Sequence, residues 1–189
     1  MKTLLFAITF CFVTSVGMSQ GFEAYIIGGT TFSQIDGDNL AGYNKFGFTA
    51  GGASNFILEN GLSFQQEITF YQRGSRATSD QLFDDIFTYK TLNYIDVTAL
   101  LNKRLKDRWL IQGGVGAGKL IGIKTDDPND QLSYYAIDLF PIIGGGFFLT
   151  ENLLVNVRMQ YTLISADKYI SIRNNTLALS LRYRFISKD

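Results

Sequence analysis

The stretch GGVGAGKL, residues 113–120, is where residue types and spacing come nearest to a site for chemistry. Gly113, four intervening residues, Gly118 and Lys119 follow the G-x-x-x-x-G-K spacing of a phosphate-binding loop. Leu120, however, stands where a Ser or Thr hydroxyl would bind magnesium. The residues that follow read as a strand, whereas a phosphate loop must open a helix whose N-terminal amides hold the phosphates. We therefore predict no nucleotide site here, and the glycines need a structural reason.

Residues suited to catalysis or metal binding are scarce in the rest of the chain. It has no histidine, which removes the commonest general base and the commonest metal ligand. Its one cysteine, Cys11, lies in an apolar N-terminal run. Asp126, Asp127 and Asp130 lack the spacing of an EF-hand, so a solvated acidic turn is favoured over a calcium site. We expect no enzymatic activity, no cofactor and no metal, and keep acyl transfer or proteolysis on a barrel rim as a weak alternative.

The N-terminal segment has the layout of a secretory signal peptide. Lys2 is a short positive region, Leu4 to Val13 is an apolar region, and Gly17 and Ser19 are small residues before Gln20. We predict a cleaved signal peptide over residues 1–19 and one mature domain over residues 20–189. A retained membrane helix is disfavoured by the Ser, Gly and Gln that interrupt the run.

Charge and composition restrict the partners of the predicted mature domain. Without Lys2 it has 17 − 1 = 16 basic residues against 17 acidic ones, a net charge of −1. A basic excess is therefore absent from the sequence, and we expect no nucleic-acid partner. The 16 Phe, 10 Tyr and single Trp favour strands over disorder.

Alternation with a period of two repeats along the chain and predicts strands. In the last segment Leu177, Leu179, Leu181, Tyr183 and Phe185 share one face, and Arg182 and Arg184 share the other. Eight such segments can be traced, at 22–33, 45–58, 62–74, 89–103, 108–123, 134–149, 152–164 and 174–186.

The connections between these segments alternate in length. Residues 59–61, 104–107 and 150–151 form short turns, whereas 34–44, 75–88, 124–133 and 165–173 are longer and polar. Short turns on one side and long loops on the other are typical of outer-membrane barrels, and strands of about 9–11 residues suffice to cross the bilayer. We predict an all-β fold: an eight-stranded antiparallel up-and-down transmembrane β-barrel with a polar, side-chain-filled lumen. The alternative is a soluble barrel of the lipocalin kind, in which the interior is apolar.

Along each predicted strand, the charged residues lie on the face opposite to the apolar one. In a membrane barrel this charged face points into the lumen. We predict a lumen network in which Glu67 and Asp96, on neighbouring strands, form the acidic pole, because unpaired buried charges are costly. Its predicted members are Glu67, Asp96, Asp138, Arg73, Arg158, Arg182 and Arg184.

The same phase explains the glycines of the opening stretch. If Trp109 faces lipid, the glycines that face the lumen leave room for long arginines and ease the curvature of a small barrel. These predicted lumen glycines are Gly114, Gly116, Gly118, Gly144 and Gly146. Gln66 interrupts the lipid-facing phase, and a bulge there is an open alternative.

Aromatic residues mark two belts on the predicted lipid face. One, beside the short turns, comprises Phe56, Trp109, Phe147, Tyr183 and Phe185. The other, nearer the long loops, comprises Phe32, Phe46, Phe70, Tyr135 and Tyr161. Ordinary strand aromatics are the alternative reading.

Several stretches resemble the PorT-like outer-membrane barrels. They are GFTAGG, LSFQQEITFYQRG, LNYIDVTALLNKRL, WLIQGGVGAG and LALSLRYRF. Gln66 and Thr98 stand where members often have Pro, and Ile186 to Asp189 follow Phe185, which resembles a C-terminal assembly signal. The resemblance implies an outer-membrane barrel with both termini in the periplasm. For the name-giving member it implies an accessory role in protein secretion.

The function predicted from these features is structural. We expect a non-enzymatic, monomeric barrel in the outer membrane of a Gram-negative bacterium. It would contact membrane lipids and lipopolysaccharide and serve assembly or secretion partners through its loops. Leu82, Phe83, Ile86 and Phe87 are candidates for that contact, and the alternative is that they extend the barrel wall. The alternative is a small porin-like channel for solutes.

Overall fold

A computed structural model of the chain describes residues 21–38, 42–77, 89–106, 108–125, 136–163 and 173–188. All eight predicted strands are found, with ends that differ from the predicted ones by at most three residues. They are β1 (Gly21–Asp36), β2 (Lys45–Ile57), β3 (Leu62–Arg76), β4 (Tyr89–Leu105), β5 (Trp109–Thr125), β6 (Ile137–Phe148), β7 (Leu153–Tyr161) and β8 (Arg173–Lys188), with a 3-10 turn η2 (Glu59–Gly61). The predicted signal peptide, Tyr135, the three aspartates of 126–130 and the apolar residues of 82–87 lie outside the described residues.

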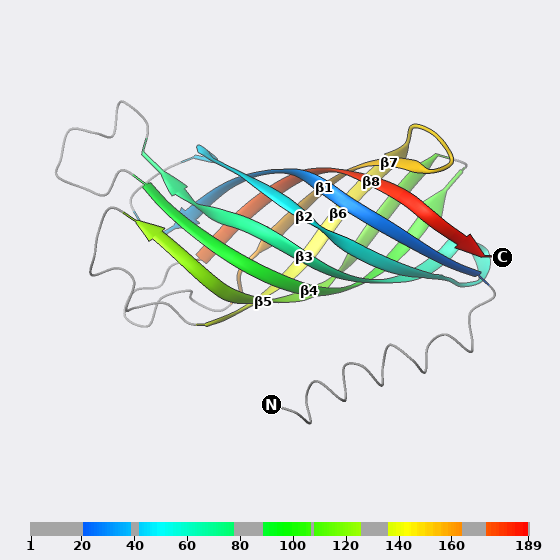
Figure 1. Cartoon of the computed structure of the whole chain (residues 1–189), viewed down its shortest axis with the longest axis horizontal. Helices are drawn as coiled ribbons and strands as arrows, with labels where there is room; N and C mark the ends of the chain where they lie inside the picture. The colour runs from blue at the N-terminus through cyan, green and yellow to red at the C-terminus, as the bar shows by residue number, and fades with distance from the viewer. Residues whose placement is uncertain are drawn as a thin grey trace, which may run out of the picture.

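The strands form one closed antiparallel barrel in sequence order, with β8 paired to β1 (Figure 1). Closure satisfies every strand edge, which is the condition for a sheet to stand in a hydrocarbon environment. Register shifts occur between Ala24 and Tyr25 and between Asn93 and Tyr94. Gln66 pairs with Ser54 and with Ala99 in unbroken register, so the bulge considered at that position does not occur.

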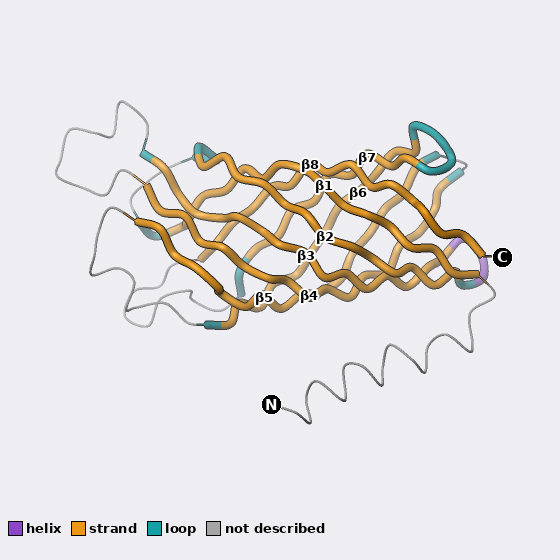
Figure 2. The backbone as a smooth tube through the Cα atoms, viewed as in Figure 1, coloured by secondary structure: helices purple, strands orange, loops and turns teal. Residues whose placement is uncertain are grey.

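The two ends of the barrel differ, as the tube in Figure 2 shows. The start of β1, the C-terminus and the short β2–β3, β4–β5 and β6–β7 turns lie at one end, here called the turn end. The four longer connections join strands at the other end, here called the loop end. The β2–β3 turn is tight because two consecutive residues in it adopt positive φ: Asn60 at 59° and Gly61 at 71°.

Gly74 has a structural role near the loop end of β3. Its φ is 143°, and a Cβ there would collide with the carbonyl oxygen of Lys90 on β4. Only glycine adopts this backbone without strain, so Gly74 allows β3 to remain paired with β4 up to Arg76.

The barrel has an apolar outside and a mostly polar inside. Along β8, Leu177, Leu179, Leu181, Tyr183 and Phe185 are exposed, whereas Ser180 and Arg182 between them are buried. The lumen also holds three small apolar clusters, and the largest joins Ile35, Tyr71, Leu92, Tyr94 and Ala178. An outer surface of this kind suits lipid rather than water, which argues against the soluble barrel. Within the described ranges, no helix is both long and apolar enough to cross a membrane.

Candidate functional site

The first lumen cluster is built around one carboxylate and is here called the Glu67 cluster. Glu67 of β3 binds Arg158 of β7 in a bidentate pair, Nη1–Oε2 at 2.5 Å and Nη2–Oε1 at 2.6 Å. Arg182 of β8 donates to the same Oε1 at 2.7 Å. Gln65 adds a hydrogen bond of 2.6 Å. All three charged side chains are about 1% exposed, so the cluster crosses the lumen in a dry setting.

The second lumen cluster is built around one guanidinium and is here called the Arg73 cluster. Arg73 of β3 forms ion pairs with Asp96 of β4 and, at 3.1 Å, with Asp138 of β6. It also donates to Gln160 Oε1 at 2.8 Å. Asp138 Oδ2 accepts a further hydrogen bond of 3.0 Å from Thr162.

Aromatic rings surround the guanidinium of the Arg73 cluster. Its Cζ lies 4.6 Å from the ring centre of Phe140, 4.9 Å from that of Tyr94 and 5.3 Å from that of Tyr71. Rings at these distances attract a cation through their negative faces and exclude water from it. Arg73 is 1% exposed, which makes it a fully buried cation at the loop-end side of the lumen.

A third ion pair closes the lumen near the turn end. Arg184 Nη1 lies 2.5 Å from Glu23 Oε1, and Tyr25 and Asn55 donate to Glu23 Oε2 at 2.7 and 2.8 Å. The Arg184 side chain is 15% exposed, so this pair is wetter than the two clusters. A pocket of about 90 Å³ lies beside it, lined by Glu23, Tyr25 and Arg182 among others.

The structure rearranges the predicted network in two respects. Glu67 and Asp96 do lie on neighbouring strands, but they bind different arginines: Glu67 binds Arg158 and Arg182, and Asp96 binds Arg73. Each carboxylate therefore belongs to its own cluster. Arg184 pairs with Glu23, which the sequence reasoning missed, although Glu23 shares the inward phase of Tyr25 and Ile27.

The five predicted lumen glycines lie on the inward phase of β5 and β6, and they make room for different neighbours. A Cβ at Gly118 would meet Asp96 Oδ1, and one at Gly144 would meet Arg158 Cγ at 2.9 Å. At the other three positions the nearest side chain is apolar: Leu100 beside Gly114, Phe140 beside Gly116 and Leu154 beside Gly146. The room left by these glycines is thus occupied by aliphatic and aromatic side chains as well as by the charged clusters.

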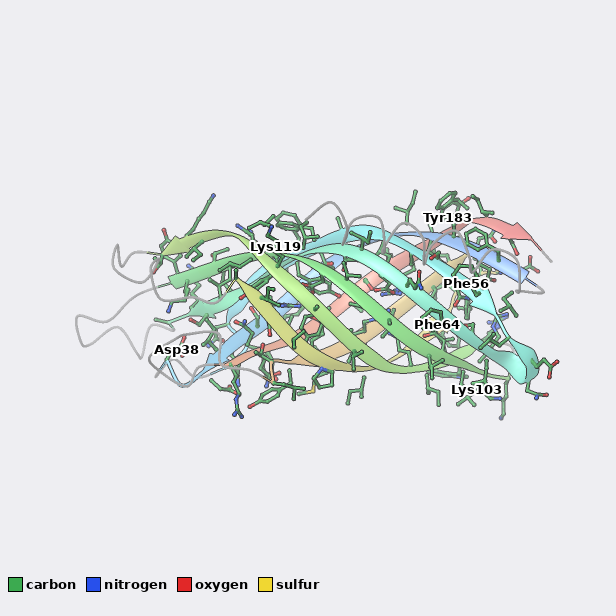
Figure 3. The ribbon with its side chains drawn as sticks, turned by 90° about the horizontal axis from the view of Figure 1, so that it is seen from below. Asp38, Phe56, Phe64, Lys103, Lys119 and Tyr183 are labelled. Carbon is green, nitrogen blue, oxygen red and sulfur yellow. The ribbon has the colours of Figure 1, made fainter. Side chains whose placement is uncertain are left out.

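The aromatic residues predicted for the turn end lie on the outer face, with one departure. Trp109, Tyr183 and Phe185 are more than half exposed, and the Phe147 ring packs 4.9 Å from Trp109. Phe56 is on the outward phase but only 5% exposed, and its ring lies 5.5 Å from that of Phe22. Phe56 is therefore covered by neighbouring side chains and is not an exposed girdle residue. Figure 3 shows Phe56 and Tyr183 near the end opposite Asp38.

The outer residues predicted nearer the loop end also lie on the lipid face. Phe46 is 60% exposed and Phe32 36%, and their rings pack 5.6 Å apart. Lys119, which is exposed, lies between the two ends in Figure 3. Its long stem can carry the ammonium toward the polar interface.

These groups link strands of the barrel to one another across the lumen. The carboxylates are engaged by arginines, and no described group of three or more His, Cys, Asp or Glu residues could hold a metal ion. Amides that the sequence reasoning missed, such as Asn102, which donates to Gln65 at 2.7 Å, extend the polar lumen. Their inward phase is the signal that could have identified them.

Comparison with known proteins gives the same architecture. The family described as outer membrane protein beta-barrel domain matches residues 3–185. No curated protein matches the chain.

Two solved structures illustrate the similarity in fold. One is Ail, the attachment invasion locus protein of Yersinia pestis, at 19% identity and a TM-score of 0.52, covering 89% of this chain and 100% of that one. The other is Neisserial surface protein A, at 15% identity and a TM-score of 0.55, covering 86% of this chain and 97% of that one. At these identities the likeness extends to the fold alone.

Proposed function

Because this chain belongs to the outer membrane protein beta-barrel domain family, we propose that it is a closed, non-enzymatic barrel serving surface assembly or secretion. The barrel stands in the Gram-negative outer membrane as a single eight-stranded unit. Its loop end contacts protein partners and lipopolysaccharide. The resemblance of its strands to PorT-like barrels supports the secretion-accessory role.

The observation that carries this proposal is the ion-filled lumen. Three arginines that are 1% exposed, Arg73, Arg158 and Arg182, reach across it and meet carboxylates from other strands. An eight-stranded barrel has an interior just wide enough for side chains, so these groups occupy the path that a solute would need. This favours a closed scaffold over the porin-like alternative.

The proposal includes an orientation in which the turn end and both termini face the periplasm. The test uses Tyr43, 38% exposed at the loop end, and Leu149, 49% exposed at the turn end. Only Cys11, within the predicted signal peptide, would compete as a thiol. A membrane-impermeant maleimide should label Tyr43→Cys in intact cells and Leu149→Cys only after permeabilisation. Labelling of Leu149→Cys alone in intact cells would reverse the orientation.

The partner role is tested with a photo-crosslinking amino acid placed at Tyr43. Val115, which is 63% exposed on the lipid face of β5, provides the matched control position. We expect Tyr43 to give discrete protein adducts that include components of a secretion or surface-assembly system, and Val115 to give lipid adducts. If Tyr43 crosslinks only to lipopolysaccharide, the barrel acts alone in the envelope and the accessory role is wrong.

A further inference from the structure

The turn-end mouth of the lumen holds a basic pocket of about 550 Å³. Lys103, labelled in Figure 3, marks this end of the barrel. The lining of the pocket includes three arginines, Arg104, Arg108 and Arg184, together with Phe148, Leu149 and Glu151. These residues come from β4, β6, β8 and two short turns, so closure of the barrel brings together segments that are far apart in the sequence.

The arginines of the strands lie over the opening of the lumen rather than beside the bilayer. Arg104 is two positions after Asn102 on β4, and Arg184 is two positions after Arg182 on β8. Asn102 and Arg182 are 2% and 1% exposed inside the lumen, and residues two positions apart on a strand share a face. Arg104 and Arg184 are therefore on the inward face, where a ligand from the aqueous phase meets them and a lipid headgroup does not.

Two of the arginines contact Phe148. The Arg104 Cζ lies 4.2 Å from the centre of the Phe148 ring, and the Phe148 N–H donates to the carbonyl oxygen of Arg108 at 2.9 Å. Within the part of the chain that the structure describes, no carboxylate forms an ion pair with Arg104 or Arg108. A guanidinium group is a planar fork of donors, so both residues are suited to bind a carboxylate of another molecule.

The mouth is electropositive although one of its arginines is already paired. Arg184 Nη1 lies 2.5 Å from Glu23 Oε1, and Glu151 is the acidic residue in the lining of the pocket. Three arginines against these two carboxylates give a formal charge of 3 − 2 = +1. The β4–β5 connection, residues 103–108, has four basic residues against one acidic residue. A mouth with this excess of positive charge attracts anionic ligands.

The pocket also offers an apolar contact, which distinguishes between kinds of anion. Leu149 lines the pocket and is 49% exposed. A free phosphate ion would use the cations alone, whereas a peptide with acidic and apolar side chains uses both features. The volume lies within the range of about 300–1,000 Å³ that is typical of ligand sites.

We propose that the turn-end mouth binds an acidic peptide segment of a periplasmic protein. Its carboxylates bind Arg104 and Arg108, and an apolar side chain beside them packs on Leu149. The periplasmic source of the peptide rests on the proposed orientation, whereas the chemistry of binding follows from the mouth itself. The barrel then has a surface for protein partners at each end.

Fluorescence anisotropy with a short labelled peptide that alternates Glu and Leu tests this site. The folded barrel is reconstituted in phosphatidylcholine nanodiscs, which leave both ends open to solution and add no net lipid charge. We expect saturable binding that is about tenfold tighter than the binding of a matched Gln–Leu peptide, because that peptide lacks the carboxylates.

Substitution of the arginines locates the binding at the mouth. Arg104→Gln and Arg108→Gln should each weaken binding of the Glu–Leu peptide about fivefold, as expected for one ion pair that solvent reaches. Arg76→Gln is the matched control, because it makes the same chemical change at an exposed arginine at the loop end of β3. It should leave the affinity unchanged, and heat-dependent gel mobility verifies that each variant folds.

A substitution that strengthens binding separates the site from any loss of folding. Glu23→Gln removes the carboxylate that pairs with Arg184, which raises the formal charge of the mouth to 3 − 1 = +2. We expect the Glu–Leu peptide to bind about threefold more tightly to this variant. Unchanged or weaker binding would contradict a site that the charge of the mouth controls.

Two outcomes of the peptide series would overturn the inference. Equal affinity for the Glu–Leu and Gln–Leu peptides, or equal losses in Arg104→Gln and Arg76→Gln, would show that the mouth has no carboxylate site. Equal affinity for a Glu–Ser peptide would show that Leu149 makes no contact, and the site would bind anions of any kind.

These outcomes are separate from a failure of the proposed function. Binding in nanodiscs does not depend on orientation in the cell or on partners at the loop end, which maleimide labelling and crosslinking at Tyr43 test. Labelling of Leu149→Cys in intact cells, with peptide binding in nanodiscs retained, would instead overturn the periplasmic source of the peptide.

Discussion

The Glu67 cluster and the Arg73 cluster fill the same lumen with opposite ratios of charge. The Glu67 cluster has two arginines on one carboxylate, a formal charge of +1, and the Arg73 cluster has two carboxylates on one arginine, a formal charge of −1. Together they hold three cations and three anions. Neutrality is thus reached across the lumen rather than within each cluster.

The two clusters stabilise a buried anion and a buried cation with different kinds of neighbours. The Glu67 carboxylate is stabilised by hydrogen bonds from two guanidinium groups and from Gln65. The Arg73 guanidinium has two aspartates and three aromatic rings around it. An arginine cannot lose its charge at working pH, whereas a buried carboxylate can bind a proton, so the two clusters should fail differently.

The largest effect is expected for Glu67→Gln. This change leaves Arg158 and Arg182 adjacent within the lumen without the carboxylate that both bind. Removing one partner from a buried ion pair typically costs about 3–5 kcal/mol, and here two cations lose their partner. Urea unfolding in lipid vesicles, followed by gel mobility, measures the loss. A cost below about 1 kcal/mol would show that the cluster does not stabilise the barrel.

A somewhat smaller effect, and one that depends on pH, is expected for Arg73→Met. At neutral pH it leaves Asp96 and Asp138 without the guanidinium that both bind. The carboxylates can then become neutral by taking up protons, so the lost stability should return as the pH falls. Glu67→Gln should show no such recovery, because its stranded groups are arginines. Parallel pH profiles for the two variants would contradict the distinction between the clusters.

An intermediate effect is expected for the glycines that face the clusters. A Cβ at Gly144 would meet Val157 O at 2.5 Å and Arg158 Cγ at 2.9 Å, whereas one at Gly113 would find its nearest neighbour, Ile142 O, at 3.8 Å. Gly144→Ala should therefore cost about 1–3 kcal/mol through overpacking, and Gly113→Ala close to none. Unfolding midpoints of the two alanine variants measure the difference, and equal midpoints would show that Gly144 is not needed to seat Arg158.

The smallest effect is expected at the turn end, for Glu23→Gln. Its partner Arg184 is 15% exposed and also donates to Asn152, so it keeps both water and a hydrogen-bond acceptor. The loss should be about 1 kcal/mol or less, as for pairs that solvent reaches. A cost equal to that of Glu67→Gln, in the same unfolding assay, would mean that burial does not rank the ion pairs of this lumen.

The sequence was sufficient to predict the strands and the inward phase of the charges, because alternation with a period of two is a local signal. It was not sufficient to pair charges across the barrel. Glu67 and Arg158 are 91 positions apart, and their meeting depends on strand tilt and stagger, which no local pattern records. The same limit applies to Phe56. Its outward orientation was predicted, but its low exposure depends on contact with Phe22 of the neighbouring strand.

Single-channel current recording tests the closed lumen most directly. The purified, folded protein is inserted into planar lipid bilayers, and current is recorded at constant voltage. Because Arg73, Arg158 and Arg182 meet carboxylates across the lumen, we predict no steady conductance above that of the bare bilayer. A steady conductance of the same size at every insertion would contradict the closed scaffold and support the solute channel instead.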